Sequence, residues 1–437
     1  MTDSISKQII YKKYNQYAPR YKFVRINMSN ILANSVPVTA TGTVNVQFKM
    51  PYNTVFNLAK SRLSLTIPVL AQGAGVASST VADCYPFFNN VSFETGNGLS
   101  LLPLTDSSKF TKVNTKLNLK FDDYMTRDVT DLCYPSNEGT AANNQTGEAT
   151  DQSVAYLETR YYSKSGANAA NSLVVSYALG NFKNTILGLD KDVYYGQNDM
   201  YLKLVVDAVN KWCFDSTNNA TLPTPIGSLT NVYLYLAVEQ NPVIIDQIVQ
   251  KFSQGGLELL IDYPIVTKYT VPASTTQNLV IPFVPSNGHH LKRIIHTVWN
   301  ATEDKKDALD SENVNGAKVV SFNTYLDSTK LQDDLVSCAT ATPDDWRINQ
   351  AFCKNSAYLN HAIYAKNWFH CDSFESTDLK KNDDTLVPQE NVIDGLPMDK
   401  GIQWQFTATT AGASYIHVNF AIFQRNVLIN REGVQFV

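Results

Sequence analysis

Three histidines, His289, His290 and His296, lie close together in the sequence and could bind a metal ion. Closely spaced imidazoles bind metals in cupin-type β-barrels, where neutral ring nitrogens are the ligands. Here Gly288 comes directly before the pair and favours a turn, and no Asp or Glu follows at the spacing of a further ligand. We therefore expect no metal at these residues and interpret them as ordinary histidines near a strand.

Two acidic pairs, Asp122-Asp123 and Asp344-Asp345, could supply the two carboxylates of a glycosidase. The first pair follows a strand-like segment. The second lies in the expected first turn of a helix, where the helix dipole favours acids. The common motifs for phosphate binding, zinc hydrolysis and serine hydrolysis are also missing from the sequence. We therefore expect no enzymatic activity and no cofactor.

Two tyrosine pairs, Tyr161-Tyr162 and Tyr194-Tyr195, could stack against sugars in a lectin-like site. Tyrosines at a strand edge or at a subunit contact explain the same pairs equally well. These residues keep open an alternative function, a tandem β-sandwich protein for carbohydrate binding or adhesion.

The N-terminal residues 1–35 are basic and rich in aromatic side chains, with Asp3 as their single acid. The cations are Lys7, Lys12, Lys13, Arg20, Lys22 and Arg25, and Tyr14 and Tyr17 are among the interleaved tyrosines. Such a composition is typical of an arm that lies on a polyanion or a neighbouring subunit. The alternative, a polar leader whose tyrosines pack on its own domain, has equal support at this point.

The elements that would position these residues are mostly short strands. The chain has 437 residues, more than one hydrophobic core usually supports, so two core units are expected. Only 17% of its residues are charged, and Asn, Thr, Ser, Tyr and Phe recur throughout, which favours an all-β protein. The net charge of −4 argues against a dedicated nucleic-acid binder. The six cysteines have no regular spacing, so free thiols are expected.

Period-2 alternation of apolar and polar residues predicts the strands directly. The expected strands are 43–50, 63–67, 116–121, 200–206, 232–238, 265–271, 279–284, 291–299, 319–326, 402–408 and 415–423. Polar stretches without this alternation are expected to form long surface loops. They are 71–82, 134–152, 301–317 and 373–392, and a helix is expected to begin at Thr342.

A different period appears between the two groups of strands. Apolar residues at 244, 245, 248, 249 and 252 follow the spacing of one helical face. Asn241 is a favourable N-cap, Pro242 suits the first helical position, and Gly255 could adopt a left-handed conformation at the C-terminus. We expect a short helix that links two β units.

Two sequence matches indicate that the units are duplicates. Residues 51–58 and 272–279 share the pattern P-x-polar-T-x-x-N-L, and residues 232–240 match 416–424 in alternation. The offsets are 221 (272 − 51) and 184 (416 − 232), so the first unit is expected to hold the longer insertions.

Several stretches resemble the double jelly-roll major capsid proteins of icosahedral DNA viruses, among them virophages, Polinton-like viruses and large eukaryotic DNA viruses. They are Phe48-Lys49-Met50-Pro51, Asn57-Leu58, residues 61–65, Leu291-Lys292-Arg293-Ile294 and Gly395-Leu396-Pro397-Met398-Asp399. The resemblance covers residues 40–437 and departs from the large viruses in a shorter N-terminal side. It implies a homotrimer whose six jelly rolls form a pseudo-hexagonal capsomer, with the N-terminal arm inside.

The fold expected from these observations is all-β, with two tandem eight-stranded antiparallel jelly-roll sandwiches. Residues 1–40 are expected to form the arm, 41–241 the first jelly roll, 242–256 the linker helix and 257–437 the second jelly roll. The resemblance implies a major capsid protein made in the host cytosol and found in the virion. Its expected partners are neighbouring capsomers, penton and minor capsid proteins, and DNA or a membrane reached through the arm.

Overall fold

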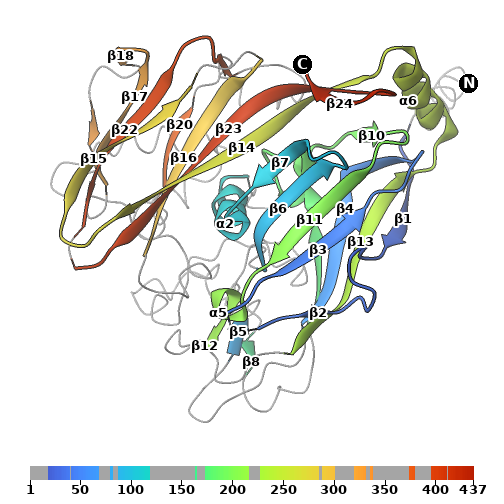
Figure 1. Ribbon diagram of the computed structural model, residues 1–437, viewed down its shortest axis with the longest axis horizontal. Coiled ribbons are helices and arrows are strands. Elements are labelled where there is room, and N and C mark those ends of the chain that lie inside the picture. The colour runs from blue at the N-terminus through green and yellow to red at the C-terminus, as the bar shows by residue number, and fades with distance from the viewer. Residues whose placement is uncertain are drawn as a thin grey trace, which may run out of the picture.

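The computed structural model describes most of the two β units (Figure 1). The described residues are 18–39, 41–67, 79–81, 87–118, 163–164, 173–215, 227–284, 288–300, 319–330, 335–337, 374–378, 395–410 and 412–437. The expected loops 134–152 and 301–317 and the expected helix after Thr342 lie outside these residues.

The first unit consists of two facing antiparallel sheets. One sheet contains, in spatial order, β1 (Tyr21–Ile26), β13 (Ser228–Glu239), β4 (Val55–Ile67) and β10 (Asp192–Tyr194), with β2 (Val36–Pro37) beside β13 and β9 (Leu173–Ala178) beside β4. The other contains β3 (Val44–Lys49), β11 (Met200–Val206), β6 (Phe88–Thr95) and β7 (Ser100–Leu104). A small sheet joins β12 (Cys213–Asp215), β5 (Ser79–Val81) and β8 (Ser163–Lys164). The helical segments are α2 (Ser107–Asn118), α5 (Val209–Trp212), η4 (Leu179–Asn181) and η5 (Ile186–Gly188).

The second unit repeats this arrangement. One sheet contains β14 (Leu257–Val271), β23 (Tyr415–Asn430), β16 (His290–Asn300) and β20 (Phe374–Asp378), with β21 (Leu396–Pro397) beside β16 and β24 (Gly433–Phe436) beside β23. The other contains β15 (Thr276–Phe283), β22 (Ile402–Thr409), β17 (Val319–Leu326) and β18 (Thr329–Lys330), with β19 (Val336–Ser337) beside β17.

The two units have the same topology. When the eight strands of the two main sheets are numbered in chain order within each unit, one sheet has the order 1-8-3-6 and the other 2-7-4-5, in both units. Two facing four-stranded sheets with these long connections form a jelly roll. The prediction of two tandem eight-stranded jelly rolls is therefore confirmed.

Only one of the two sequence matches joins the same strand in both units. Residues 232–240 and 416–424 do belong to the eighth strand of each unit. In contrast, residues 51–58 lead from strand 2 to strand 3, whereas residues 272–279 lead from strand 1 to strand 2. They match because they form the same turn, with Asn53 and Ser274 both at positive φ. The shared pattern reflects local turn chemistry and not equivalent positions.

The predicted linker helix is confirmed as α6 (Pro242–Gln254). The side chain of Asn241 accepts a hydrogen bond from the backbone N–H of Val243, as expected of an N-cap. The C-terminal prediction is wrong by one residue, because Gly255 is extended and Gly256 has a φ of 105°. The helix connects strand 8 of the first unit to strand 1 of the second, at the upper right of Figure 1.

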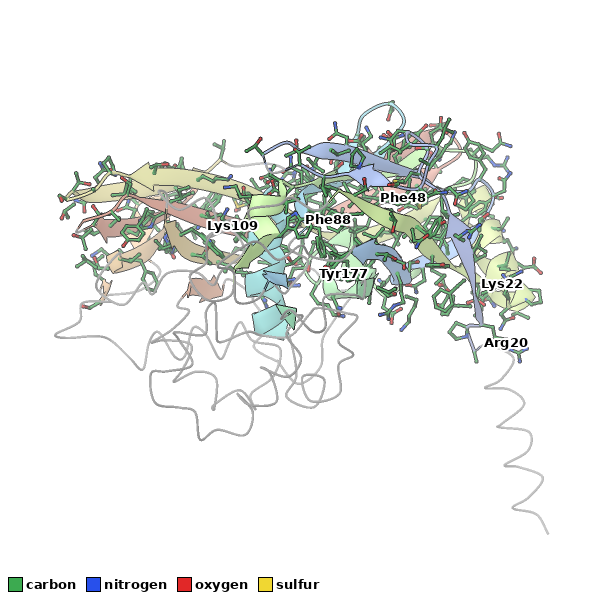
Figure 2. All side chains as sticks on the ribbon, turned by 90° about the horizontal axis from the view of Figure 1, so that it is seen from below. Arg20, Lys22, Phe48, Phe88, Lys109 and Tyr177 are labelled. Atoms are coloured by element: carbon green, nitrogen blue, oxygen red, sulfur yellow. The ribbon has the colours of Figure 1, made fainter. Side chains whose placement is uncertain are left out.

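Each jelly roll buries an apolar core between its sheets. Phe48, Phe88 and Tyr177 lie inside the first unit (Figure 2) and are at most 3% exposed. Trp404 and Phe406 have the same position in the second unit. The first core also extends onto the outer face of the second unit's 1-8-3-6 sheet, so the two units pack directly against each other.

Four predicted segments need correction. Residues 107–118 form α2, so the strand expected at 116–121 is wrong within the described part, to residue 118. Residues 374–378 form β20 inside an expected loop, and residues 79–81 form β5 inside another. The expected arm 1–40 is wrong for residues 21–26, which pair with β13 over six residues as β1.

Candidate assembly surfaces

The residues predicted to form inner-arm contacts are only partly described. Lys7, Lys12, Lys13, Tyr14 and Tyr17 lie outside the described residues. Arg20, Lys22 and Arg25 are exposed and belong to β1 or its start. Figure 2 shows Arg20 and Lys22 at one end of the molecule, far from Lys109. These three cations sit on an edge strand of the first jelly roll rather than on a separate arm.

A buried carboxylate fixes the start of this edge strand. Oε1 of Glu239, which is 1% exposed, accepts hydrogen bonds from the backbone N–H groups of Arg20, Gln240 and Asn241. The donor–acceptor distances are 2.8, 2.9 and 2.7 Å. The Asn241 side chain also donates to the carbonyl of Ala18. One side chain therefore ties β1, the end of β13 and the beginning of α6 together.

The packing of one unit on the other forms a surface that we call the junction. Its apolar part joins Phe110 of α2 to Phe420 of β23, with ring centroids 5.4 Å apart in an edge-to-face arrangement. Trp299 of β16 lies beside them, and the Lys109 ammonium is 5.5 Å from the centroid of its ring. Phe110, Phe420 and Trp299 are each at most 1% exposed. Figure 1 shows α2 between the strands of the two units.

A buried ion pair completes the junction. Asp106 and Lys109 are 4% and 5% exposed, and Lys109 Nζ is 3.4 Å from Asp106 Oδ1. Lys268 of β14 approaches the other oxygen of Asp106 at 2.5 Å. Asp106 therefore accepts a cation from each unit, which offsets the cost of burying Lys109. The junction thus pairs the strand-5 side of the first unit with the outer face of the second unit's 1-8-3-6 sheet.

On the equivalent outer face of the first unit, described side chains remain exposed. We call it the open face, and its residues are Phe23, Arg25, Arg62, Val174, Tyr233 and Tyr235. Strand register places them on one side of β1, β13, β4 and β9. Phe23 and Val174 are each 53% exposed, whereas Trp299 and Phe420, on the outer face of the second unit's sheet, are at most 1% exposed.

The open face combines aromatic rings with cations. The Arg25 guanidinium carbon is 4.8 Å from the ring centroid of Tyr233, and Tyr233 contacts Tyr235 edge-to-face at 6.4 Å. Arg62 is held flat on the sheet because its guanidinium donates to the hydroxyl and to the carbonyl of Ser176. Aromatic side chains and arginine are the types enriched in protein interfaces.

The alternative sites are not assembled by the described residues. His296 is buried beside His417, whereas His289 packs edge-to-face on Phe423, so the three neighbouring histidines do not converge. No group of three or more His, Cys, Asp or Glu side chains in the described part of the chain could hold a metal ion. None of the described helices is long and apolar enough to cross a membrane.

One tyrosine pair is part of the core. Tyr195 is 3% exposed and stacks on Phe56, and Tyr194 packs edge-to-face on Phe252 of α6. The interpretation of Tyr194-Tyr195 as a sugar-stacking surface is therefore wrong. Tyr161-Tyr162 and the acidic pairs Asp122-Asp123 and Asp344-Asp345 lie outside the described residues.

No model of a known protein family matches this sequence, and no curated protein matches it either. Solved structures do match over nearly the whole chain. The VP54 protein of PBCV-1, fitted into a reconstruction of the virophage Sputnik, has a TM-score of 0.59 at 10% identity, covering 96% of this chain and 97% of that one.

Two further structures agree with this match. The PBCV-1 capsid gives a TM-score of 0.53 at 9% identity, covering 96% of this chain and 97% of that one. The mavirus major capsid protein gives 0.51 at 14% identity, covering 95% and 89%. At such low identity the likeness is one of fold. The chain has the double jelly-roll fold found in major capsid proteins of icosahedral viruses.

Proposed function

We propose that this chain is a major capsid protein that assembles as a homotrimer, a pseudo-hexagonal capsomer of an icosahedral virus shell. The observation that carries the proposal is the contrast between two equivalent faces. The outer face of the 1-8-3-6 sheet is buried at the junction in the second unit, but it remains open, aromatic and cationic in the first.

A second copy of the chain could cover the open face. The second unit has the same topology as the first, so it has its own strand-5 side, at β18 (Thr329–Lys330). If that side docks on the open face of a neighbouring copy, the contact of the junction is repeated between chains. A head-to-tail contact closes into a ring when its rotation divides a full turn. About 60° per unit gives a ring of six units, and hence of three chains.

The wider partners follow from the same proposal. Capsomers would contact each other and penton and minor capsid proteins in the virion, after synthesis in the host cytosol. Residues 1–17, which include Lys7, Lys12 and Lys13, would face the interior and contact protein, DNA or a membrane. A carbohydrate-binding or adhesion function has less support, because Tyr194 and Tyr195 belong to the core.

A charge reversal on the open face tests the proposal. In the proposed trimer the Arg62→Glu variant would bury an unmatched acid next to Tyr235, so it should shift the purified chain from trimer to folded monomer. Arg431→Glu, a charge reversal at the exposed turn between β23 and β24, is the matched control and should leave the trimer intact. Light scattering coupled to size exclusion reports the mass, and circular dichroism reports the fold. An Arg62→Glu chain that remains trimeric would contradict the assignment of the open face to the subunit interface.

A further inference from the structure

Two histidines contact each other inside the second jelly roll. His296 of β16 and His417 of β23 have no exposed surface, and Nε2 of His296 is 3.1 Å from Nδ1 of His417. The two strands are hydrogen-bonded neighbours near the middle of the 1-8-3-6 sheet. Both side chains belong to the face of this sheet that packs against the 2-7-4-5 sheet.

Aromatic rings surround the pair. Trp404 and Phe406 of β22 each have ring centroids 4.6 Å from that of His296, and Phe406 is 5.3 Å from His417. The remaining ring nitrogens, Nδ1 of His296 and Nε2 of His417, have no hydrogen-bond partner among the described residues. This environment accommodates two neutral imidazoles and offers little to stabilise an imidazolium.

The other elements around the pair contribute few titratable groups. On β14, Tyr269 is the register partner of His417, and its hydroxyl donates to the carbonyl of Val280. On β20, Glu375 is the register partner of His296. The facing strands β15, β17 and β22 contribute only uncharged residues to this core. They are Leu279, Ile281 and Phe283 of β15, Val319 and Phe322 of β17, and Ile402, Trp404, Phe406 and Ala408 of β22.

The same two strands carry the junction on their opposite face. Trp299 lies three residues after His296 on β16, and Phe420 lies three residues after His417 on β23. Both contact α2 of the first unit, through Lys109 and Phe110. A change in the packing of β16 and β23 therefore reaches the contact between the two units.

We propose that the His296–His417 pair is an acid-sensitive switch, which weakens the second jelly roll and its junction with the first when the imidazoles become protonated. Protonation would place a charge in the aromatic core, and a second proton would add repulsion across the 3.1 Å contact. The packed sheet would have to open to hydrate these charges.

The direction of the pH effect follows from burial. Burial lowers the pKa of His417 from 6.5 to about 4, and burial together with His417 lowers the pKa of His296 well below its usual value. In mild acid the unfolded chain therefore binds more protons than the folded chain. Stability is fully present above pH 6.5 and falls as the pH drops toward 4. For His417 alone, the unfolding equilibrium constant should rise about 30-fold between pH 7.5 and pH 5.

Urea unfolding of the full chain at pH 7.5 and pH 5, followed by circular dichroism, tests the switch. The His417→Gln and His296→Gln variants cannot acquire the charge. His417→Gln should therefore lose the roughly 30-fold change in the unfolding constant assigned to this residue, and His296→Gln should also reduce the pH dependence. His290→Gln, a half-buried histidine at the start of β16, is the control and should behave as wild type. A pH dependence that is undiminished in both variants, or one that disappears only in Glu375→Gln, would overturn the proposal.

A measurement on the unmodified chain covers the case in which a variant does not fold. In histidine-labelled protein, NMR should show two imidazoles that stay neutral at pH 5.5 while the chain remains folded. Titration of all six histidines near pH 6.5 with the fold intact would refute the switch. Neither experiment depends on capsid assembly, so the outcome is independent of the proposed function.

Discussion

Removal of the Glu239 carboxylate should detach the first strand of the chain from its sheet. In Glu239→Ala, the backbone N–H groups of Arg20, Gln240 and Asn241 lose their common acceptor. Hydrogen bonds to a charged group contribute about 1.5 to 3 kcal/mol each. Water can replace the carboxylate at the two donors that are only partly buried, so the expected loss of unfolding free energy is about 3 to 5 kcal/mol.

The loss should be local before it is global. Hydrogen exchange read by mass spectrometry should show faster exchange in residues 20–26, while β4 and β13 keep their protection. Glu239→Gln retains one acceptor oxygen and should lose clearly less stability in urea unfolding. A Glu239→Ala chain destabilised by less than about 1 kcal/mol, or one with unchanged exchange in β1, would refute the role assigned to this carboxylate.

Three further predictions concern the junction, the linker helix and the N-terminus. Asp106→Ala removes the acid beside the buried Lys109 and should lower the free energy of unfolding by about 3 to 5 kcal/mol in urea unfolding. Lys268→Ala, at a half-exposed partner, should lower it by less than about 1 kcal/mol, and equal losses would contradict the description of Asp106–Lys109 as the buried ion pair of the junction. Ile248 of α6 is only half-buried, so Ile248→Asp should lower the free energy of unfolding by about 1 to 2 kcal/mol. Phe252→Ala should lower it more, by about 3 to 5 kcal/mol, and the reverse order would show that the helix packs through a different face. Deletion of residues 2–17 should leave a folded trimer with impaired shell assembly, whereas deletion of residues 2–30 also removes β1 and should lower the melting temperature. If the variant that lacks residues 2–17 assembles normally, these residues do not have the proposed role.

Strands with one buried face were predictable because every second side chain is apolar where it packs into the core. Met200, Leu202, Leu204 and Val206 alternate with partly exposed residues, and each is at most 2% exposed. Such a pattern has a period of two whatever the rest of the chain does. The linker helix was predictable for a similar reason, because its cap residues and apolar face are local.

The edge strand β1 and the helix α2 lack a clear alternation or helical spacing of apolar residues in their sequences. β1 has the sequence YKFVRI and no fully buried residue, so its alternation is hidden by exposed Lys22, Phe23 and Arg25. α2 carries Leu117 near its end, where the apolar spacing resembled a strand. Its first turns are buried by the second unit, through contacts of Lys109 and Phe110 that no local window contains.

The candidate surfaces depend on pairs that are distant in sequence. His296 and His417 are 121 residues apart, and Phe110 contacts Phe420 across the two units. Alternation places each residue on a face of its strand, but only the strand order 1-8-3-6 makes β16 and β23 neighbours. The open face could not be predicted from the sequence for the same reason, because it is identified only by comparing the 1-8-3-6 sheets of the two units.

The mass of the purified chain in solution is the most direct test of the capsid proposal. One chain has a mass of 48.6 kDa, so a capsomer of three chains would be about 146 kDa (3 × 48.6). Sedimentation velocity at micromolar concentration and neutral pH should give a single species of that mass, reduced to 48.6 kDa by Arg62→Glu. A wild-type chain that sediments as a folded monomer under these conditions would contradict the proposal that it builds a capsid.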